Sequence, residues 1–314
     1  MVISRRSFLF SSAAFAVAPY LRTFAAEAAP RLRMGILSDI HVRGKDWTLE
    51  PFVQALKWFD AQKVDGVVIA GDLADFGMVE QLKVVGETWD SFFPDGKAKD
   101  GRSVEKVFVT GNHDYNFYNH PRMKKKYPDE KDRFDRSIAK DFNAAWTACF
   151  HEPYRPISVK TVKGYPFVMR HYREEGLAAF MEKAKFDPKK PFFYVYHCHP
   201  KGTCYGSESD KVADKGDTKK VLSAFPNCIA LTGHTHYPLT DPDILWRGEF
   251  ASLGCGSLLY AGIRDGKGGD RGDYNLHHGM LMDVYDDRIV FARRNFAPKA
   301  VETLGEDLIV RIRI

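Results

Sequence analysis

The sequence lacks a strong excess of charge of either sign. Its 314 residues contain 46 Lys and Arg against 41 Asp and Glu, which gives a formal net charge of +5. Residues 1–28 supply +2 of this, so the rest of the chain carries about +3. Such a mildly basic balance gives no reason to expect a stable nucleic acid partner.

The sequence also lacks an internal repeat and any linker long enough to separate two domains. Hydrophobic residues make up 44% and charged residues 28%, as in a globular protein with a large core. The length would allow two domains, but α/β chains of this size often form one. We therefore expect a single domain over residues 31–314.

The apolar stretch near the N-terminus is too short to cross a membrane. Ser7–Leu21 falls short of the roughly 20 residues that a spanning helix needs. A charged start precedes it and the alanine-rich Ala25–Ala29 follows it, which is the order of an export signal. The sequence therefore predicts a cleaved signal over residues 1–28, and no membrane partner for the mature chain.

The start of this signal resembles the bacterial twin-arginine type. Arg5 and Arg6 are followed by Ser-Phe-Leu, although Phe10 stands where that signal often has Lys. The resemblance implies the twin-arginine export machinery as a partner and cleavage near Ala26 or Ala28. We expect the mature protein to be periplasmic or secreted.

Cysteine is sparse. In the oxidising compartment expected here, an odd count leaves at least one cysteine unpaired, and the pairing cannot be read from the sequence. Cys198 follows His197 directly, so its thiol either supports a site or belongs to the core. The cysteines are Cys149, Cys198, Cys204, Cys228 and Cys255.

Polar residues with metal-binding side chains follow each of five predicted strands. The strands are short apolar runs, rich in β-branched residues, as expected of buried parallel strands. Each of the first, fourth and fifth is followed by a pair of such residues with one residue between. The predicted strands and the residues that follow are Leu32–Leu37 with Asp39 and His41, Val67–Ala70 with Asp72, Val107–Val109 with Asn112 and His113, Phe192–Tyr196 with His197 and His199, and Ile229–Thr232 with His234 and His236.

This pattern favours a metal site at the carboxyl edge of a sheet, where open α/β sheets bind ligands. Side chains two residues apart on an extended segment point the same way, so Asp39 and His41 can share one ion. His234 and His236 can do the same. The structural alternative is that these residues only form turns, which Gly, Asn and Asp favour. Each motif alone is weak evidence, and the recurrence over five strands favours the metal site.

The rest of the chain predicts further helices and a β-rich end. Residues 115–156 mix aromatic and basic residues, and the run Lys124–Tyr127 is either a solvated face or part of an insertion that holds an anionic group. Further strands are expected at Phe250–Leu253, Gly279–Tyr285, Ile289–Ala292 and Leu308–Ile312, and a hairpin at Val159–Val162 and Phe167–His171. Helices are expected at Glu50–Gln62, from after Gly77 to about Phe93, at Glu130–Phe150 and at Glu174–Phe186.

The five motifs in this order resemble the calcineurin-like metallophosphoesterases, which include purple acid phosphatases, protein Ser/Thr phosphatases and cyclic-nucleotide phosphodiesterases. The resemblance covers roughly residues 32–240. Lys201–Gly206 and Gly305–Asp307 look like an exported bacterial branch. The resemblance implies an α/β fold that is a four-layer α-β-β-α sandwich with two mixed sheets.

The resemblance also implies a binuclear metal centre. Asp72 would bridge the two ions, since one carboxylate has two oxygens to share. Nitrogen and oxygen ligands suit iron, manganese or zinc. The first ion would be held by Asp39, His41 and His236, and the second by Asn112, His197 and His234. His199 would either contact these ligand residues without binding the ion or be the ligand in place of His197.

The resemblance implies hydrolysis of a phosphomonoester or phosphodiester by a metal-bound hydroxide, with His113 protonating the leaving oxygen. Asp75 would orient His113; its structural alternative is a carboxylate at a helix start. The family's protein phosphatases carry an Arg where this chain has Phe76, which argues against protein phosphatase activity.

Two other functions stay open. A nuclease or nucleotide phosphodiesterase would need a basic groove with stacking aromatic residues, and the mild net charge disfavours it. A non-catalytic binding protein on the same fold is disfavoured because the whole ligand set and His113 are present.

Overall fold

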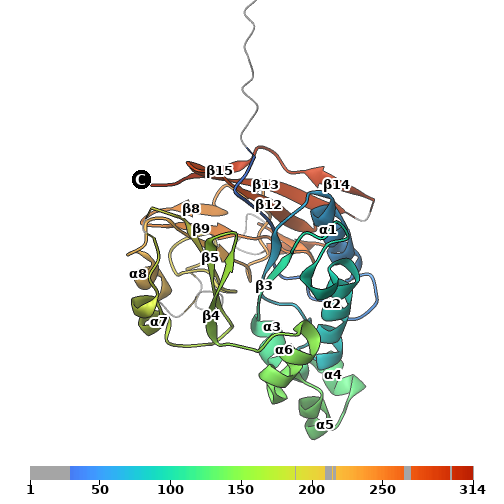
Figure 1. The fold of residues 1–314 in the computed structure, drawn as a ribbon. Helices are drawn as coiled ribbons and strands as arrows, with labels where there is room; N and C mark the ends of the chain where they lie inside the picture. Colours follow the sequence, from blue (N-terminus) through green and yellow to red (C-terminus); the bar gives the residue numbers. More distant parts are fainter. Residues whose placement is uncertain are drawn as a thin grey trace, which may run out of the picture.

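Two large mixed β-sheets pack face to face, and helices cover their outer faces (Figure 1). The structure is a computed structural model that describes residues 29–187, 189–208, 214, 217–264, 270–297 and 299–313. The α/β fold with two mixed sheets that was predicted from the sequence is confirmed. The expected export signal, residues 1–28, lies outside the described residues.

The first sheet has seven strands in the order β14-β13-β12-β1-β2-β3, with β15 also paired to β13. Its strands β1, β2 and β3 are parallel, and β12 runs antiparallel to β1. Its strands are β1 (Leu32–Leu37), β2 (Gly66–Ala70), β3 (Glu105–Val109), β12 (His278–Val284), β13 (Arg288–Ala297), β14 (Ala300–Thr303) and β15 (Leu308–Arg311).

The second sheet has six strands in the order β4-β5-β6-β7-β9-β8. The four central strands are parallel, and the two edge strands run antiparallel to their neighbours. Its strands are β4 (Ile157–Val162), β5 (Tyr165–Arg170), β6 (Phe192–Val195), β7 (Cys228–Thr232), β8 (Leu245–Arg247) and β9 (Ala251–Gly254). A separate hairpin, β10 (Ala261–Arg264) and β11 (Asp270–Asp273), follows this sheet.

Alternation along the strands produces three apolar cores, one between the sheets and one under each helical layer. In β2, Val68 faces the core between the sheets while Ile69 faces α1 and α2. In β6, Val195 faces the inner core while Tyr194 faces α7 and α8. The helices on the outer faces are α1 (Glu50–Ala61), α2 (Val79–Phe92) and α6 (Phe142–Phe150) on the first sheet, and α7 (Leu177–Lys183) and α8 (Thr218–Leu222) on the second.

The prediction of one helix over Glu130–Phe150 is wrong. The segment instead forms α5 (Glu130–Asp135), the 3-10 turn η3 (Ile138–Lys140) and α6. The chain is extended at Ser137, which bridges to Met78, and the backbone N–H of Ile138 donates to the carbonyl oxygen of Gly77. This contact with the loop after β2 replaces the helical hydrogen bonds, and the sequence pattern alone does not show it.

The remaining short helices gather below the sheets in Figure 1, next to the loop after β3. They are α3 (Asn112–Asn116), η2 (Phe117–Asn119) and α4 (Pro121–Lys126). A further 3-10 turn, η1 (Pro94–Gly96), directly follows α2. The predicted helix at Glu174–Phe186 is shorter, because α7 covers only its middle. No helix in the described residues combines the length and apolarity needed to cross a bilayer.

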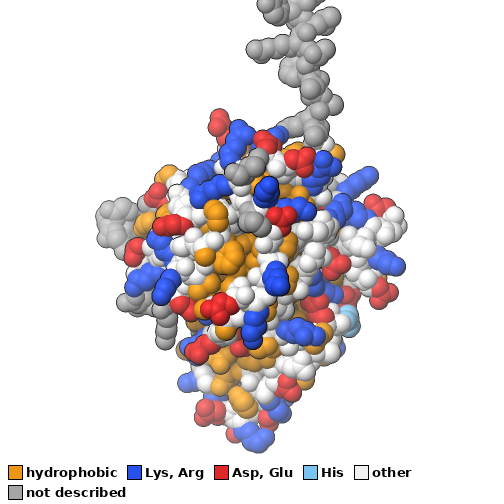
Figure 2. Space-filling model, turned by 60° about the vertical axis from the view of Figure 1, so that its left-hand side comes forward, with side chains coloured by type: hydrophobic (Ala, Val, Ile, Leu, Met, Phe, Trp, Pro, Cys, Tyr) orange, Lys and Arg blue, Asp and Glu red, His pale blue; other side chains and the backbone are white. Residues whose placement is uncertain are grey.

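The surface mixes charges of both signs. On the face shown in Figure 2, basic and acidic side chains are interspersed around an apolar strip. No continuous basic groove crosses the part of this face that the structure describes. Such mixing agrees with the small net charge of the chain.

Hydrogen bonds at His171 link the end of β5 to the end of β3. Its Nδ1 accepts the backbone N–H of Thr110 at 3.0 Å, and the backbone N–H of Tyr172 donates to Thr110 Oγ1 at 3.1 Å. Burial lowers the pKa of His171 to about 3, so the ring is neutral in the folded protein. The two sheets are thus joined by a neutral histidine close to the edge that carries the predicted site.

We expect His171 to make the protein less stable in acid. Because its folded pKa lies below the ordinary 6.5, its neutral ring contributes stability above pH 6.5 that is lost as the pH falls. The free energy of unfolding should drop by about 1.4 kcal/mol per pH unit below pH 6 from this group. Denaturant titrations at pH 7 and pH 5 should show a smaller drop for His171→Gln.

One control variant and one expected residual effect define this result. His151→Gln changes a mostly exposed histidine and should keep the wild-type pH dependence. A residual drop is expected in His171→Gln, since burial also lowers the pKa of His199 to about 3 and of His278 to about 4. An unchanged drop in His171→Gln would contradict the prediction.

Candidate metal centre

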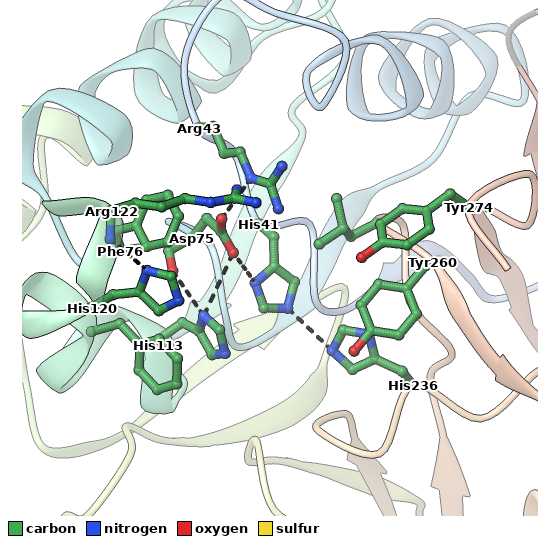
Figure 3. A pocket seen from close by; sticks show the side chains of 12 residues that line it. His41, Arg43, Asp75, Phe76, His113, His120, Arg122, His236, Tyr260 and Tyr274 are labelled. Atoms are coloured by element: carbon green, nitrogen blue, oxygen red, sulfur yellow. Dashed lines mark hydrogen bonds and ion pairs between the residues drawn. The ribbon is translucent and has the colours of Figure 1, made fainter. Parts of the chain in front are cut away.

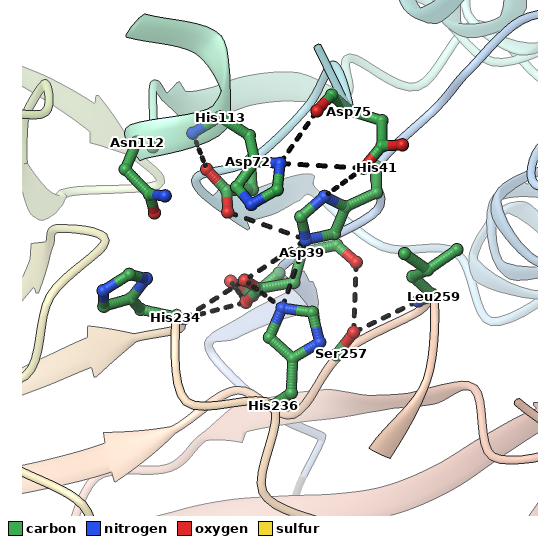
Figure 4. Close-up of polar contacts among 12 residues, drawn as sticks. Asp39, His41, Asp72, Asp75, Asn112, His113, His234, His236, Ser257 and Leu259 are labelled. Atoms are coloured by element: carbon green, nitrogen blue, oxygen red, sulfur yellow. Dashed lines mark hydrogen bonds and ion pairs between the residues drawn. The ribbon is translucent and has the colours of Figure 1, made fainter. Parts of the chain in front are cut away.

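The seven predicted ligand residues lie together at one edge of the two sheets, and Figure 4 shows several of them. They follow the carboxyl ends of β1, β2, β3, β6 and β7. Two groups of ligand atoms converge and share Asp72. The first group is Asp39, His41, Asp72 and His236, and the second is Asp72, His197 and His234.

The backbone turns left-handed at five of these residues, which differs from the extended segment expected for Asp39 and His41. Their φ angles are 50° and 45°. The other three are Asp72 at 54°, His234 at 73° and His236 at 56°. Such conformations cost roughly 1–3 kcal/mol each and concentrate at functional sites. The paired side chains therefore converge through strained turns and not through strand alternation.

In the first group the imidazoles of His41 and His236 face each other. Their Nε2 atoms are 3.1 Å apart, and His236 Nε2 lies 3.0 Å from Asp39 Oδ1. His41 Nε2 lies 3.6 Å from Asp72 Oδ2. All four side chains of this group are buried.

In the second group, His197 lies between two oxygen atoms. Its Nε2 is 3.2 Å from Asp72 Oδ2 and 3.0 Å from Asn112 Oδ1. The ring of His234 lies 4.7 Å from that of His197, measured between ring centroids. Asn112 thus lies next to the second group, where the sequence resemblance would make it a ligand.

The protonation pattern of these rings fits a cation. His41 Nδ1 lies 3.1 Å from Asp75 Oδ1, and His197 Nδ1 lies 2.9 Å from the carbonyl oxygen of Ala70. Both partners can only accept, so each Nδ1 carries a proton. In a neutral ring the Nε2 lone pair would then face the carboxylate of Asp72. Acceptors that face acceptors repel each other unless positive charge lies among them.

The pKa values of His41 and His197 also indicate that positive charge is stabilised here. Burial alone would lower the pKa of His41, but its hydrogen bonds to Asp39 and Asp75 raise it to about 10. Burial is likewise outweighed at His197, where Asp72 and Asp39 raise the pKa to about 9. Despite burial, the charges of His236 and His197 hold the pKa of Asp39 well below its usual range. The charges of His197 and His113 likewise lower the pKa of Asp72. A bound cation replaces these protons in a metal site, so the donor set fits metal ions.

Two glycines let the loops approach this closely. A Cβ at Gly111 would collide with Asp72 Oδ1, and a Cβ at Gly71, whose φ is +96°, would collide with the His197 ring. Any other residue would push Asp72 or His197 out of the cluster. The glycines that precede Asp72 and Asn112 are therefore part of the site.

Asp114, which directly follows His113, holds two loops together. Its buried carboxylate accepts the backbone N–H groups of Gly111 at 2.8 Å, Ala74 at 2.7 Å and Leu73 at 3.1 Å. Burial and the charge of Asp72 raise its pKa to about 6. Asp114 thus positions the loops that carry Asp72 and Asn112, a role that its spacing in the sequence does not reveal.

His113 lies beside the metal groups with one ring nitrogen fixed. Its Nδ1 is 2.8 Å from the backbone carbonyl oxygen of Asp75 and 3.6 Å from the carboxylate oxygen Oδ1. The ring stacks on Phe117 with centroids 3.6 Å apart and meets His41 edge-on at 4.4 Å. Nδ1 therefore carries a proton and donates it, which leaves Nε2 as the nitrogen that can meet a ligand.

Asp75 contacts both sides of this arrangement. Its carboxylate accepts from His41 Nδ1 and, at 2.6 Å, from Arg43 Nε. Burial would raise its pKa, but the hydrogen bonds with His113 and His41 lower it well below the usual range. Asp75 does not start a helix, since α2 begins at Val79. The residue fixes His113 through its carbonyl group more closely than through its side chain.

His199 points away from both groups. Its Nδ1 lies 2.6 Å from Thr232 Oγ1 and its Nε2 lies 3.1 Å from Thr235 Oγ1, so both ring nitrogens are engaged. The five cysteines are free and buried, and Cys198 packs in the core under α7 and α8. Burial raises the pKa of the Cys198 thiol to about 12. None of these residues supplies a ligand atom to the two groups.

Two cavities open beside His113 and His236, and neither was apparent from the sequence. The first, of about 220 Å³, is lined by Arg43, Arg122 and Phe76 among others (Figure 3). The second, of about 420 Å³, reaches Asp72, Asn112 and His234. Tyr260 and Tyr274, with ring centroids 5.0 Å apart, line both cavities.

A loop after β9 positions Tyr260. The hydroxyl of Ser257 donates to the carbonyl oxygen of Asp39 at 3.2 Å (Figure 4). The backbone N–H of Leu259 donates to the same oxygen at 3.2 Å. The Tyr260 ring lies 4.4 Å from that of His236 between centroids. No strand-end motif marks Ser257, Tyr260 or Tyr274 in the sequence, so only the three-dimensional arrangement identifies them.

Two mixed sheets with Asp- and His-bearing loops at a common edge are the features expected from the resemblance to the metallophosphoesterases. The family model described as Calcineurin-like phosphoesterase matches residues 32–238. This is more than half of the chain, and the protein belongs to that family. The resemblance inferred from the five motifs is confirmed at the level of the family.

One solved structure supports the fold, and two others are more distant. A dimetal phosphatase from Danio rerio is 12% identical, with a TM-score of 0.50, and the match covers 90% of this chain and 100% of that chain. The phosphoesterase Yfce from E. coli is 16% identical with a TM-score of 0.40, covering 90% and 100%. GAP50 of Plasmodium, described as an anchor in the inner membrane complex, is 12% identical with a TM-score of 0.45, covering 88% and 89%. No curated protein matches the sequence.

Proposed function

We propose that the protein is a binuclear metal-dependent phosphoesterase that hydrolyses phosphomonoesters or phosphodiesters. The observation that carries this proposal is the pair of ligand groups that share Asp72, with His113 beside them. Asp39, His41, Asp72 and His236 would hold one ion, and Asp72, Asn112, His197 and His234 the other. Iron, manganese or zinc suits these nitrogen and oxygen donors.

Two such ions, when bound, supply an activated water and neutralise charge on the phosphate. The residues of the chain would hold the ions in place and supply the proton. Asp72 is held in place because its Oδ1 accepts the backbone N–H of His113 at 2.8 Å. His113 Nε2 would protonate the leaving oxygen, since Nδ1 is fixed on Asp75 and the ring lines both cavities. A diester can place one substituent in each cavity.

We expect metal removal to abolish hydrolysis. Dialysis against a chelator should lower turnover of p-nitrophenyl phosphate and of bis(p-nitrophenyl) phosphate to the background rate. Manganese, iron or zinc should restore it, whereas calcium should not, because calcium prefers all-oxygen sites. Elemental analysis should give two metal equivalents in the active form. Full activity in protein free of metal would overturn the proposed function.

We also propose that the mature protein acts in the periplasm or is secreted after twin-arginine export. The support is the sequence of residues 1–28 alone. Replacing both Arg5 and Arg6 with Lys should leave the precursor in the cytoplasm, as seen by fractionation and immunoblotting. The control is Arg22→Lys, which lies outside the arginine pair and should be exported normally. Normal export of the double variant would point to the general secretory route.

A further inference from the structure

The smaller cavity beside the metal groups carries an excess of positive charge. We call it the arginine cavity, because Arg43 and Arg122 line it together with Phe76, His113 and Tyr260. The only carboxylate among its described lining residues is that of Asp75. This carboxylate is already shared by Arg43 and His41.

Arg43 is held in place, and within the described residues only the Nε of its guanidinium donates a hydrogen bond. Its Nε donates to Asp75 Oδ2 at 2.6 Å, and its guanidinium lies over the rings of Trp47 and Phe76 at 5.5 and 6.0 Å. The side chain is 23% exposed. Because only Nε is used by Asp75, the two terminal nitrogens remain to bind an anion, and little side-chain freedom is lost when they do.

Arg122 reaches the same cavity from a different element. It lies in α4, and its side chain extends in the direction of Arg43 in Figure 3. No carboxylate in the described part of the chain forms an ion pair with it. The backbone N–H of Arg122 donates to the His120 side chain at 3.2 Å, which caps the start of the helix. Two guanidinium groups thus face one small space with a single, already shared, counter-charge.

The larger cavity offers no such charge. Its described lining residues include Asp72, Asn112 and His234 but neither lysine nor arginine. Both cavities reach His113 and His236, so both adjoin the place where the phosphate would bind. Only the arginine cavity therefore distinguishes a substrate with a second anionic group from one without it.

We propose that Arg43 and Arg122 bind a second anionic group of the substrate, a phosphate or a carboxylate, next to the phosphate that is hydrolysed. The proposal rests on the proposed function and names its substrate class: a small phosphoester that carries two anionic groups. One carboxylate, that of Asp75, separates Arg43 from His41. The two anionic groups therefore lie close enough to belong to one small molecule.

The test compares ligands that cannot be hydrolysed. Calorimetric titration of the metal-loaded protein with phosphonoacetate and with methylphosphonate compares a phosphonate with and without a carboxylate. The wild type should bind phosphonoacetate at least about tenfold more tightly, since hydrogen bonds between ionised groups are strong. Arg122→Ala should reduce this ratio to about threefold or less, and Arg43→Ala should do the same.

The matched control is Lys124→Ala, which removes a positive charge from the same helix outside the cavity and should keep the wild-type ratio. Methylenediphosphonate, titrated in parallel, shows whether a second phosphate is preferred to a carboxylate. Equal affinities for phosphonoacetate and methylphosphonate in the wild type, or no binding of either, would overturn the proposal. The proposal would also be overturned if Lys124→Ala lowered the preference for phosphonoacetate as much as Arg122→Ala does.

Failure of the proposed function gives a different result. Metal-loaded protein that hydrolyses no ester but prefers phosphonoacetate through Arg122 would contradict the phosphoesterase and support the anion site. Turnover of ethyl phosphate and 2-phosphoglycolate at equal kcat/KM would support the phosphoesterase and contradict the anion site. An enzyme with the site should favour 2-phosphoglycolate about tenfold, and Arg122→Ala should remove that preference.

Discussion

Asp72→Asn is expected to lose both metal and turnover while the fold survives. The amide keeps the shape of the side chain but cannot supply a negative oxygen to each of two ions. Since bound metals contribute several kcal/mol to transition-state stabilisation, kcat should fall by at least about 10³-fold. Elemental analysis should give fewer than two metal equivalents, and circular dichroism should match the wild type.

The matched control for this prediction is Asp95→Asn. Asp95 has a left-handed backbone like Asp72, with φ of 52° against 54°, but it is exposed and remote from the ligand groups. The control variant should keep both metals and full turnover. Two metal equivalents together with normal activity in Asp72→Asn would remove the assignment of Asp72 as the bridging residue.

His113→Ala is expected to separate substrates by their leaving groups. An alkoxide needs a proton as it leaves, whereas p-nitrophenolate is already a stable anion. The variant should therefore lose about 10²–10⁴-fold on an alkyl phosphoester and less than about tenfold on p-nitrophenyl phosphate. Metal content should not change, because the proposed ligand groups do not include His113.

The structure allows two other roles for His113, and the comparison of the two substrates distinguishes them. Loss of metal with equal loss on both substrates would make His113 a ligand, since it also lies in a cluster with His41 and Asp75. Equal losses with both metals in place would assign it to charge stabilisation or phosphate binding. His151→Ala, at an exposed histidine, should affect neither substrate.

The strands and the candidate ligand residues that follow them could be located because both signals are local. A continuous β-branched run such as Val67–Ala70 identifies a buried strand, and parallel strands bring their carboxyl ends to one edge. The contacts of Asp72 and Asn112 with His197 follow from that rule. The local pattern also predicted the amphipathic helix α1 and its buried Phe52, Leu56 and Phe59 correctly.

What was missed depends on contacts between distant segments. Ser137 interrupts a helical pattern because it pairs with Met78. Arg122 and Tyr274 reach the site from a short helix and from the residues that follow β11, where no periodicity marks them. The left-handed turns at Asp39 and His41 are likewise set by the loops around them, since Asp39 and His41 donate their backbone N–H groups to the carbonyl oxygens of Gly71 and Asp72.

The left-handed turns restrict which amino acids can occupy the ligand positions. Among residues other than glycine, Asn, Asp and His are several-fold enriched at positive φ. Glutamate coordinates metals as well as aspartate does, but it lacks the short side chain that makes such a backbone tolerable. Asp39, Asp72 and His41 thus meet two independent requirements at once, one chemical and one conformational. Substitution at these positions is therefore limited to a smaller set of residues than metal chemistry alone would allow.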